Sequence, residues 1–399
     1  MKQRKVVQSL QVVAGLLSVA SLAAARPLII SQSTSGGNGP YFHSPSLSAN
    51  GSIAFYYDGD LTGGNAGHNP EVFRFDTATN TITQVTSGLC TPSVRICSFF
   101  LSGGASGSIA FAAGYDPTGA NPDGNLEIFR FDPATNTIIQ ITNSTGAFCG
   151  NANPAMSTNG SIAFASNCDL TGGNPDGNSE IFHFDPATNA FTQITRSTSC
   201  TSFPSSSIAD GSIAFTSNCD LTGGNPDGNF EVFRFDAATN SVSQVTNSTG
   251  YCGLDEPASL SASGSAIAFQ SNCDLTGGNP DGHFQIFLFD AVTDTITQIT
   301  NSTGPCLSAF PSLSANGSIA FDSTCDPTGA NPDGNLEIFV FDAVTKRLTQ
   351  ITHSTGYCAN GIASLNALGS IAFQSTCDLT GGNPEGNREI FLATPRHRR

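Results

Sequence analysis

The sequence has 399 residues, 12 cysteines, no tryptophan and a formal net charge of −16. A surface this acidic disfavours binding to nucleic acid and to anionic membranes, so we expect neither kind of partner. Beyond the first 25 residues, no apolar run is long enough to span a bilayer, and we expect no membrane insertion.

The first 25 residues have the layout of a secretory signal peptide. A basic start at positions 2–5 precedes an apolar stretch that ends at Leu22, and Ala23-Ala24-Ala25 is a cleavage site of small residues. The alternative is a membrane anchor, but polar residues at positions 8, 9 and 11 interrupt the apolar stretch. We therefore predict a secreted or periplasmic mature chain of residues 26–399. Cleavage removes three basic residues and changes the net charge to about −19.

A short apolar motif recurs along the whole mature chain. The motif, Gly-Ser-Ile-Ala-Phe or a close variant, occurs seven times at spacings of 51 to 56 residues. A fixed period in this range indicates a propeller, a solenoid or an array of repeats. The copies end at Phe55, Phe111, Phe164, Phe215, Phe269, Phe321 and Phe373.

Each copy predicts four short antiparallel strands, A to D. Asn159-Gly160 is a strong hairpin signal between strands A and B, and Pro186 and Asn189 suit the turn between strands C and D. A loop rich in Gly, Asn, Pro and Asp joins strands B and C. In the third copy the expected strands cover residues 153–157, 161–165, 180–184 and 191–195.

About 53 residues for each four-stranded unit, repeated seven times, fits a β-propeller. One such sheet cannot bury both of its faces, whereas blades that stack around an axis can. We therefore predict an all-β, seven-bladed propeller that forms a single domain over residues 26–399. A β-solenoid is the alternative, but its repeats are usually shorter, and hairpin turns at both ends of the repeat argue against it.

The segment from Pro311 to Phe321, followed by Glu-Ile-Phe-x-Phe-Asp and Thr-Gln-Ile-Thr, resembles the TolB-like, WD-repeat-like β-propeller repeat. The resemblance covers nearly the whole mature chain. It implies a propeller fold and a role in binding or scaffolding, since such propellers resemble binding modules and some accompany peptidase domains.

The cysteines suggest disulfides within the blades of an exported protein. Ten of them occupy two fixed repeat positions; copy one lacks both, and copy two has Cys97 seven residues after Cys90 instead. Metal binding is the alternative, but no CxxC motif or Cys/His cluster supports it. The predicted pairs are Cys90–Cys97, Cys149–Cys168, Cys200–Cys219, Cys252–Cys273, Cys306–Cys325 and Cys358–Cys377.

Acidic residues recur in the loops between strands B and C. Oxygen ligands gathered in this way could bind calcium, which is the one cofactor that the sequence suggests. The alternative is that Pro-Asp-Gly is only a turn with solvated acids, and the full EF-hand series is absent. The candidate ligands are Asp169, Asp176 and Glu180 in the third copy and Asp220, Asp227 and Glu231 in the fourth.

The loops from strand D to the next strand A differ most between copies and should lie on the same face of the ring as the acidic loops. Variable loops that carry aromatic residues on a rigid scaffold suit a ligand site, although these aromatics could simply cover the blades. The ligand-face candidates are Phe148, Phe203, Asp255, Glu256, Phe310 and Tyr357.

Signals of catalysis are poor, because the sequence lacks G-x-S-x-G, H-E-x-x-H and a phosphate-binding loop. We predict a monomeric, non-catalytic propeller that binds a protein, a peptide or a glycan through its loop-rich acidic face. The alternative is a propeller enzyme, a glycan hydrolase or lyase, that uses carboxylates near the central channel.

Copy seven supplies only three strands, and the segment Leu28–Gln32 stands where a fourth strand would precede copy one. We predict that Leu28–Gln32 pairs with the strand that begins at Glu389 and so closes the ring. Without this pairing the last blade would present an open edge.

Overall fold

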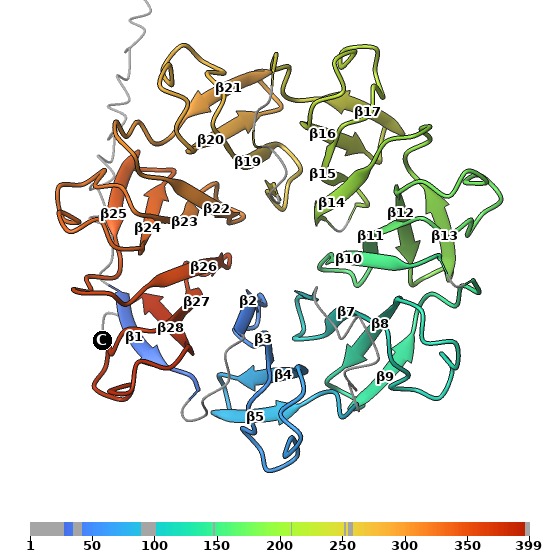
Figure 1. Cartoon of the computed structure of the whole chain (residues 1–399), viewed down its shortest axis with the longest axis horizontal. Coiled ribbons are helices and arrows are strands. Elements are labelled where there is room, and N and C mark those ends of the chain that lie inside the picture. Colours follow the sequence, from blue (N-terminus) through green and yellow to red (C-terminus); the bar gives the residue numbers. More distant parts are fainter. Residues whose placement is uncertain are drawn as a thin grey trace, which may run out of the picture.

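The computed structural model describes residues 28–34, 42–88, 101–146, 148–208, 210–250, 253 and 258–395. These residues form seven four-stranded antiparallel sheets arranged around a central axis (Figure 1). The predicted all-β, seven-bladed propeller is thereby confirmed. No helix in the described ranges has the length and hydropathy needed to cross a membrane.

Each blade runs from an inner strand A beside the channel to an outer strand D. The first three blades are β2 (Phe42–Leu47), β3 (Ile53–Tyr57), β4 (Glu71–Asp76) and β5 (Thr81–Gln84); β6 (Leu101–Gly103), β7 (Ile109–Ala113), β8 (Glu127–Asp132) and β9 (Thr137–Gln140); and β10 (Asn151–Met156), β11 (Ile162–Ser166), β12 (Glu180–Asp185) and β13 (Ala190–Gln193).

The other four blades follow the same plan, except that the last takes its outer strand from the N-terminal segment. They are β14 (Ser202–Ser207), β15 (Ile213–Ser217), β16 (Glu231–Asp236) and β17 (Ser241–Gln244); β18 (Ser259–Leu260), β19 (Ala266–Ser271), β20 (Gln285–Asp290) and β21 (Thr295–Gln298); β22 (Ser308–Leu313), β23 (Ile319–Ser323), β24 (Glu337–Asp342) and β25 (Arg347–Gln350); and β26 (Asn360–Leu365), β27 (Ile371–Ser375), β28 (Glu389–Pro395) and β1 (Leu28–Gln32).

The hydrophobic core lies between the blades. One cluster joins Ala163 and Ile181 of blade three to Ile213, Phe215 and Phe233 of blade four. Strand B is buried on both faces because it lies in the middle of the stack, and this explains why each of these strands contains the apolar run Ile-Ala-Phe. Within each blade, a phenylalanine of strand B stacks on one of strand C, with ring centroids 5.6 to 6.0 Å apart.

The turns between strands C and D confirm the conformation that the sequence predicts. Asn189 has a positive φ of 54°, which an asparagine tolerates better than most residues do. Five other blades place a residue with φ of 52° to 56° at the same position: Asn80, Asn136, Asn240, Asp294 and Lys346.

Several inner strands contain a β-bulge that the sequence did not indicate. The residue in the bulge has a positive φ, and for Phe310 and Ile362 this conformation is strained because their side chains disfavour it. Blade four has Pro204 at this position, and its bulge begins one residue later in the register. The bulge residues with positive φ are Ser44, Asn153, Phe310 and Ile362.

Strand β1 closes the ring as predicted. It pairs antiparallel with β28 in a register from Leu28 opposite Pro395 to Gln32 opposite Phe391. In Figure 1 the first strand lies directly beside the last. After β1, the Ser33 amide donates to the Ile390 carbonyl at 2.7 Å, and the Thr34 hydroxyl donates to the buried Glu389 carboxylate. The N-terminal segment therefore supplies both an outer strand and a partner for a buried charge.

Serine hydroxyls on the inner strands tie neighbouring blades together. Ser364 of blade seven accepts a hydrogen bond from the Leu47 amide of blade one at 2.9 Å. The same bond occurs at four other blade boundaries, with Ser46, Ser102, Ser259 and Ser312 as acceptors. Blade three has Ala155 at this position, so its boundary with blade four lacks the hydroxyl.

Deletion of residues 26–34 tests the closure. The deletion removes the backbone hydrogen bonds of β1, each worth about 1 kcal/mol, and leaves Glu389 without Thr34. We expect a lower melting temperature and aggregation through the exposed edge of β28, measured by calorimetry and light scattering against a chain that begins at residue 26. An unchanged melting temperature would show that face packing alone closes the ring.

A substitution of His183 on β12 tests whether this side chain is buried next to Gly211 of blade four. Burial lowers the pKa of His183, and the nearby Asp185 offsets part of this effect. Below its ordinary pKa of about 6.5, the unfolded state takes up the proton more readily than the folded state does, so stability falls as the pH drops. We expect His183→Leu, which copies Leu288 of blade five, to lose less melting temperature between about pH 8 and about pH 5 than the wild type. Equal losses of melting temperature in the variant and the wild type would contradict the lowered pKa of His183.

Candidate functional site

The loops from strand B to strand C and from strand D to strand A share one face of the ring, which we call the loop face. Four of the predicted disulfides join the two kinds of loop: Cys149–Cys168, Cys200–Cys219, Cys306–Cys325 and Cys358–Cys377. Cys273 is also disulfide-bonded. Its predicted partner Cys252, like Cys90 and Cys97, lies outside the described residues.

The glutamate that begins strand C is part of a buried hydrogen-bond network below the loop face. Glu180 is fully buried and accepts a hydrogen bond from the Thr195 hydroxyl. It also accepts bonds from the backbone amide and the hydroxyl of Ser197, both at 2.6 Å, and from the side-chain amide of Asn178 at 2.9 Å. Glu231 has the equivalent partners Thr246 and Ser248. Both carboxylates are therefore used inside the protein.

The same network recurs around the ring with small changes. In blade one, burial raises the pKa of Glu71, although bonds from Thr86 and Gly88 oppose the shift. In blade five the residue is Gln285, which accepts from Thr300 at 2.6 Å and donates to the Ser302 carbonyl at 2.8 Å. An amide can thus fill this position, so the network is structural.

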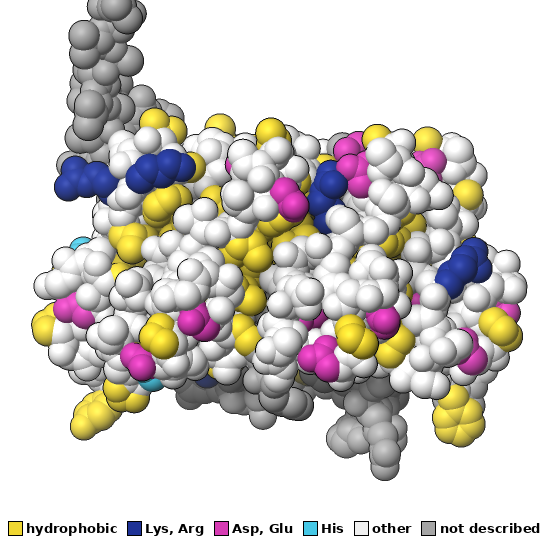
Figure 2. All heavy atoms as spheres, turned by 90° about the horizontal axis from the view of Figure 1, so that it is seen from above, with side chains coloured by type: hydrophobic (Ala, Val, Ile, Leu, Met, Phe, Trp, Pro, Cys, Tyr) yellow, Lys and Arg dark blue, Asp and Glu magenta, His cyan; other side chains and the backbone are white. Residues whose placement is uncertain are grey.

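The predicted calcium ligands are not brought together. Asp169 and Asp220 each accept a hydrogen bond at 2.9 Å from the amide of the asparagine five residues later, and so hold the loop between strands B and C. Asp176 and Asp227 are exposed in the following turn. Within the described ranges, no three His, Cys, Asp or Glu side chains gather as a metal site would require. In Figure 2 acidic side chains are scattered over the side of the disc.

A groove opens on the loop face between blades three and four, with a volume of about 550 Å³. Its wall on blade three includes Ala165, Asn167 and Ser179, and its wall on blade four includes Thr201, Phe203 and Asn218. The full lining is Gly150, Ala152, Ala165, Ser166, Asn167, Gly177, Asn178, Ser179, Ser199, Cys200, Thr201, Phe203 and Asn218. We call this hollow the inter-blade groove.

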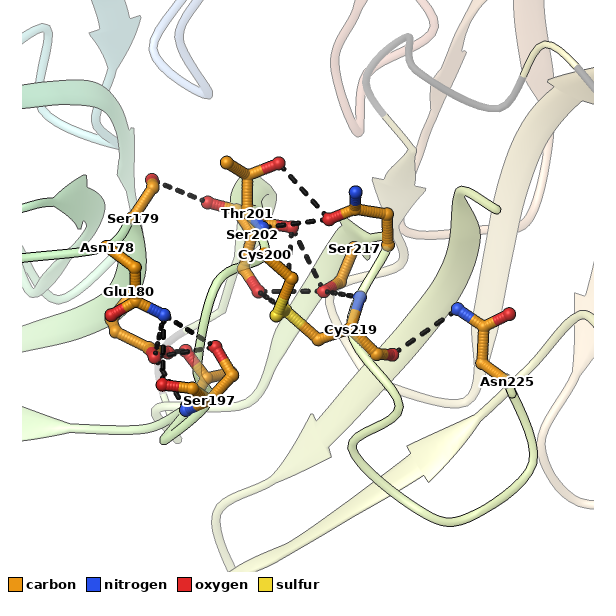
Figure 3. Close-up of a disulfide and its surroundings, with 12 residues drawn as sticks. Asn178, Ser179, Glu180, Ser197, Cys200, Thr201, Ser202, Ser217, Cys219 and Asn225 are labelled. Atoms are coloured by element: carbon orange, nitrogen blue, oxygen red, sulfur yellow. Dashed lines mark hydrogen bonds between the residues drawn. A yellow bond between two sulfur atoms is a disulfide. The ribbon is translucent and has the colours of Figure 1, made fainter. Parts of the chain in front are cut away.

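The Cys200–Cys219 disulfide separates the inter-blade groove from a second hollow of about 630 Å³. The second hollow contains Asp176, Arg196 and Asp220, so it is charged. Figure 3 shows this disulfide between the network of Glu180 and the strands of blade four. The Ser179 hydroxyl of blade three donates to the Ser202 carbonyl of blade four at 3.2 Å, which fixes the two walls relative to each other.

Two groups that bridge blades five and six have no counterpart at the boundary of the groove. Between blades five and six, Gln270 of strand B accepts a hydrogen bond from the Phe310 amide at 2.7 Å. Blade three has Ala165 at the position of Gln270, and blade four has Pro204, which has no amide hydrogen, at the position of Phe310. The hydrogen bond that joins strand B of blade five to strand A of blade six therefore cannot form between blades three and four.

The predicted ligand-face residues lie at different places. Phe203 contributes to the lining of the inter-blade groove, but its ring stacks on Phe230, which packs against the core between blades four and five, with centroids 6.4 Å apart. Phe148 and Tyr357 are almost fully exposed beside Cys149 and Cys358, and Figure 2 shows hydrophobic side chains that stand out from one rim of the disc. Phe310 is half-buried on the inner strand β22. Asp255 and Glu256 lie outside the described residues.

No protein-family model matches the chain, and no curated protein matches it. Solved structures do. An oligogalacturonate lyase from Vibrio parahaemolyticus superimposes with a TM-score of 0.55 and 14% identity, over 93% of this chain and 98% of that one. An oligogalacturonate lyase in complex with manganese gives 0.53 and 14%, over 93% and 97%.

TolB from Acinetobacter baumannii is also similar, with a TM-score of 0.41 and 18% identity over 89% of this chain and 79% of that one. The likenesses to the two lyases show a β-propeller fold and no more, because their identities are low. The resemblance to the TolB-like repeat family stays a prediction.

Substitution of Glu180 tests its structural role. Glu180→Ala leaves Thr195 and Ser197 without their buried acceptor, and we expect it to lower the free energy of unfolding by about 3 kcal/mol. Glu180→Gln, which copies Gln285, should cost about 1 kcal/mol. Chemical denaturation measures both, with the exposed Asp176→Asn as a control that stays within about 0.5 kcal/mol. Equal losses for the two Glu180 variants would contradict the structural role.

Proposed function

We propose that this chain is a secreted or periplasmic propeller that binds a protein, a peptide or a glycan through its loop face and performs no catalysis. The observation that carries the proposal is the inter-blade groove. Its volume of about 550 Å³ falls in the range of ligand sites, and its walls belong to two rigid blades. A site that is already formed loses little conformational entropy when a ligand binds.

Disulfides that tie the two kinds of loop together support both parts of the proposal. They form and persist in oxidising compartments, which is consistent with export. They also restrain the loops that differ most between blades. Variable loops on a constant scaffold are the usual place for binding residues.

The catalytic alternative has less support. The fold resembles that of oligogalacturonate lyases, but 14% identity concerns the fold alone. In the part of the chain that the structure describes, the carboxylates of strand C are enclosed by their own hydrogen bonds and no three metal-ligating side chains meet. Binding is therefore the function that the residues support best.

Arrays of peptides and glycans, probed with the full mature chain with and without calcium, test the proposal. We expect a bound class whose affinity falls about tenfold or more when Phe148, Phe203 and Tyr357 are all replaced by alanine. The matched control replaces the exposed Val292 and Val344, which lie in turns on the opposite face, and should leave affinity within about twofold. Loss of binding in this control, with the loop-face variant unaffected, would place the ligand elsewhere and reject the proposal.

A further inference from the structure

One side chain of strand C reaches from blade one to the next blade. Arg74 pairs with the Asp76 carboxylate at 2.9 Å and donates to the Ser52 hydroxyl at 2.6 Å. A Cβ atom added to Gly107 of blade two would lie 3.0 Å from the Arg74 Nε. Gly107 belongs to the turn between strands A and B, which lies on the face of the ring opposite the loop face. We call this opposite face the turn face.

Arg234 of blade four repeats this arrangement. It pairs with Asp236 at 2.8 Å, and its Nε donates to the Gly264 carbonyl of blade five at 3.0 Å. Arg130 and His183 hold the same position in blades two and three, and each lies close to the corresponding glycine of the next blade. These boundaries are thus shaped to hold a long polar side chain at the turn face.

Blade six has the short Val340 at this position, opposite Ala320 of strand B. A pocket of about 270 Å³ lies beside it, between blades six and seven, and we call it the turn-face pocket. Val340 and Asp342 are on the side of β24 that faces blade seven, because Ile338, two residues before Val340, packs in the core between these blades. Val340 stays more than 4 Å from a Cβ atom added to Gly369, the corresponding glycine of blade seven. Both residues line the pocket, which occupies the gap between them.

The groups that hold an arginine in the other blades are all present around the turn-face pocket. An aspartate, a serine and a glycine line it at the equivalent repeat positions. The corresponding residues are Asp342 for Asp76, Ser318 for Ser52, and Gly369 for Gly264. The pocket therefore offers a carboxylate, a hydroxyl and a backbone carbonyl to a cation.

The Asp342 carboxylate has no cationic partner among the described residues. Its Oδ1 accepts from the backbone amides of Val344 at 3.0 Å and Thr345 at 2.8 Å, and it forms no ion pair with a described lysine or arginine. The hydrogen bond from the Thr345 amide lowers the pKa of Asp342, although partial burial opposes the shift. The carboxylate is therefore ionised at neutral pH and places a negative charge at the pocket.

Apolar side chains of blade seven form the opposite wall. Leu28 of β1 and Pro395 of β28 lie opposite each other in the closing pair, and both line the pocket together with Leu365 and Ile371. The methylene groups of a long basic side chain can pack on such a wall while the charged end reaches a carboxylate. The volume suits a single side chain better than a drug-sized ligand.

We propose that the turn-face pocket binds a guanidinium group on a short alkyl stem, with Asp342 as its counter-ion and Ser318 and the Gly369 carbonyl as further acceptors. The ligand is an arginine side chain of a peptide or a small alkylguanidine, since both present the same group. A guanidinium has five donors in a planar fork that matches a carboxylate, so it fits better than the compact ammonium of a lysine. The site lies on the turn face, so this inference goes beyond the proposed function and does not depend on it.

Arg347 of β25 is the basic side chain that the strand register places opposite Asp342. It is exposed and makes no ion pair with Asp342, but its charge opposes the approach of a second cation. We therefore expect Arg347→Thr, which copies Thr81 of blade one, to tighten the binding of a guanidinium about twofold.

Three substitutions separate the pocket from the rest of the surface. Val340→Arg copies Arg74, so that the new side chain fills the pocket and pairs with Asp342. Leu288→Arg places the same residue between blades five and six and leaves the pocket open, as a matched control. Asp342→Asn removes the charge but keeps an oxygen that can accept from the backbone.

NMR titration of the full mature chain with acetyl-arginine amide tests the proposal. The citrulline analogue has nearly the same shape and no charge, and the lysine analogue has the same charge without the planar fork. We expect the arginine compound to bind about tenfold more tightly than either analogue, to bind about tenfold more weakly to Asp342→Asn, to lose its site in Val340→Arg and to be unaffected by Leu288→Arg. Butylguanidine and an arginine-containing tetrapeptide, titrated in parallel, show which source of the group binds more tightly.

Melting temperatures close to that of the wild type identify the folded variants, and Asp342→Asn decides the matter if Val340→Arg does not fold. The inference is wrong if no guanidine compound binds. It is also wrong if the arginine and lysine compounds bind equally and Val340→Arg keeps that binding, because the acidic surface as a whole then attracts them. Binding that appears only in a chain ending at Pro395 would overturn it too, because residues 396–399 would then hold the pocket. The proposed function at the loop face stands in each of these cases.

Discussion

The pairing of β1 with β28 is the constraint on which the rest of the structure depends. Blades in a ring can bury both faces only if the first and last also meet, and here a strand from the N-terminal segment completes the blade built by the C-terminal one. The pairing satisfies an edge that would otherwise be open, and it delivers Thr34 to the buried Glu389. The bond from the Leu47 amide to Ser364 then joins blade seven to blade one at the inner strands. The closure of the ring therefore depends on the completion of blade seven and on its contact with blade one.

The loop face combines constant supports with variable surfaces. Beneath it, the glutamates of strand C hold the chain that leaves strand D, and aspartates such as Asp169 hold the loops between strands B and C. Disulfides then join the two sets of loops. Because these supports repeat from blade to blade, single positions can change without loss of the fold. Ala165 and Pro204 are two such changes, and both lie at the boundary that holds the inter-blade groove.

Much of the fold could be predicted from the sequence because its signals are local and repeated. The period of the apolar motif predicts the blades, Asn189 predicts a left-handed turn residue, and the joint presence and absence of cysteines predicts four pairs that the structure contains. The role of Glu180 was harder to predict, since a recurrent carboxylate fits a ligand as well as a buried support. The constant spacing of 15 residues to Thr195 was the available signal. The inter-blade groove depends on residues of two blades that meet only in space, so no pattern within one repeat indicates it.

The register of the closing pair also determines how the ring would respond to a pulling force. Leu28 lies opposite Pro395, so the outermost residues of the two strands leave the sheet at the same end. Tension between these residues would load the hydrogen bonds of the pair one after another, as in opening a zip, instead of shearing them all together. A propeller tethered through both of these segments would therefore open at blade seven under low force, whereas attachment through one segment alone would leave the ring unloaded.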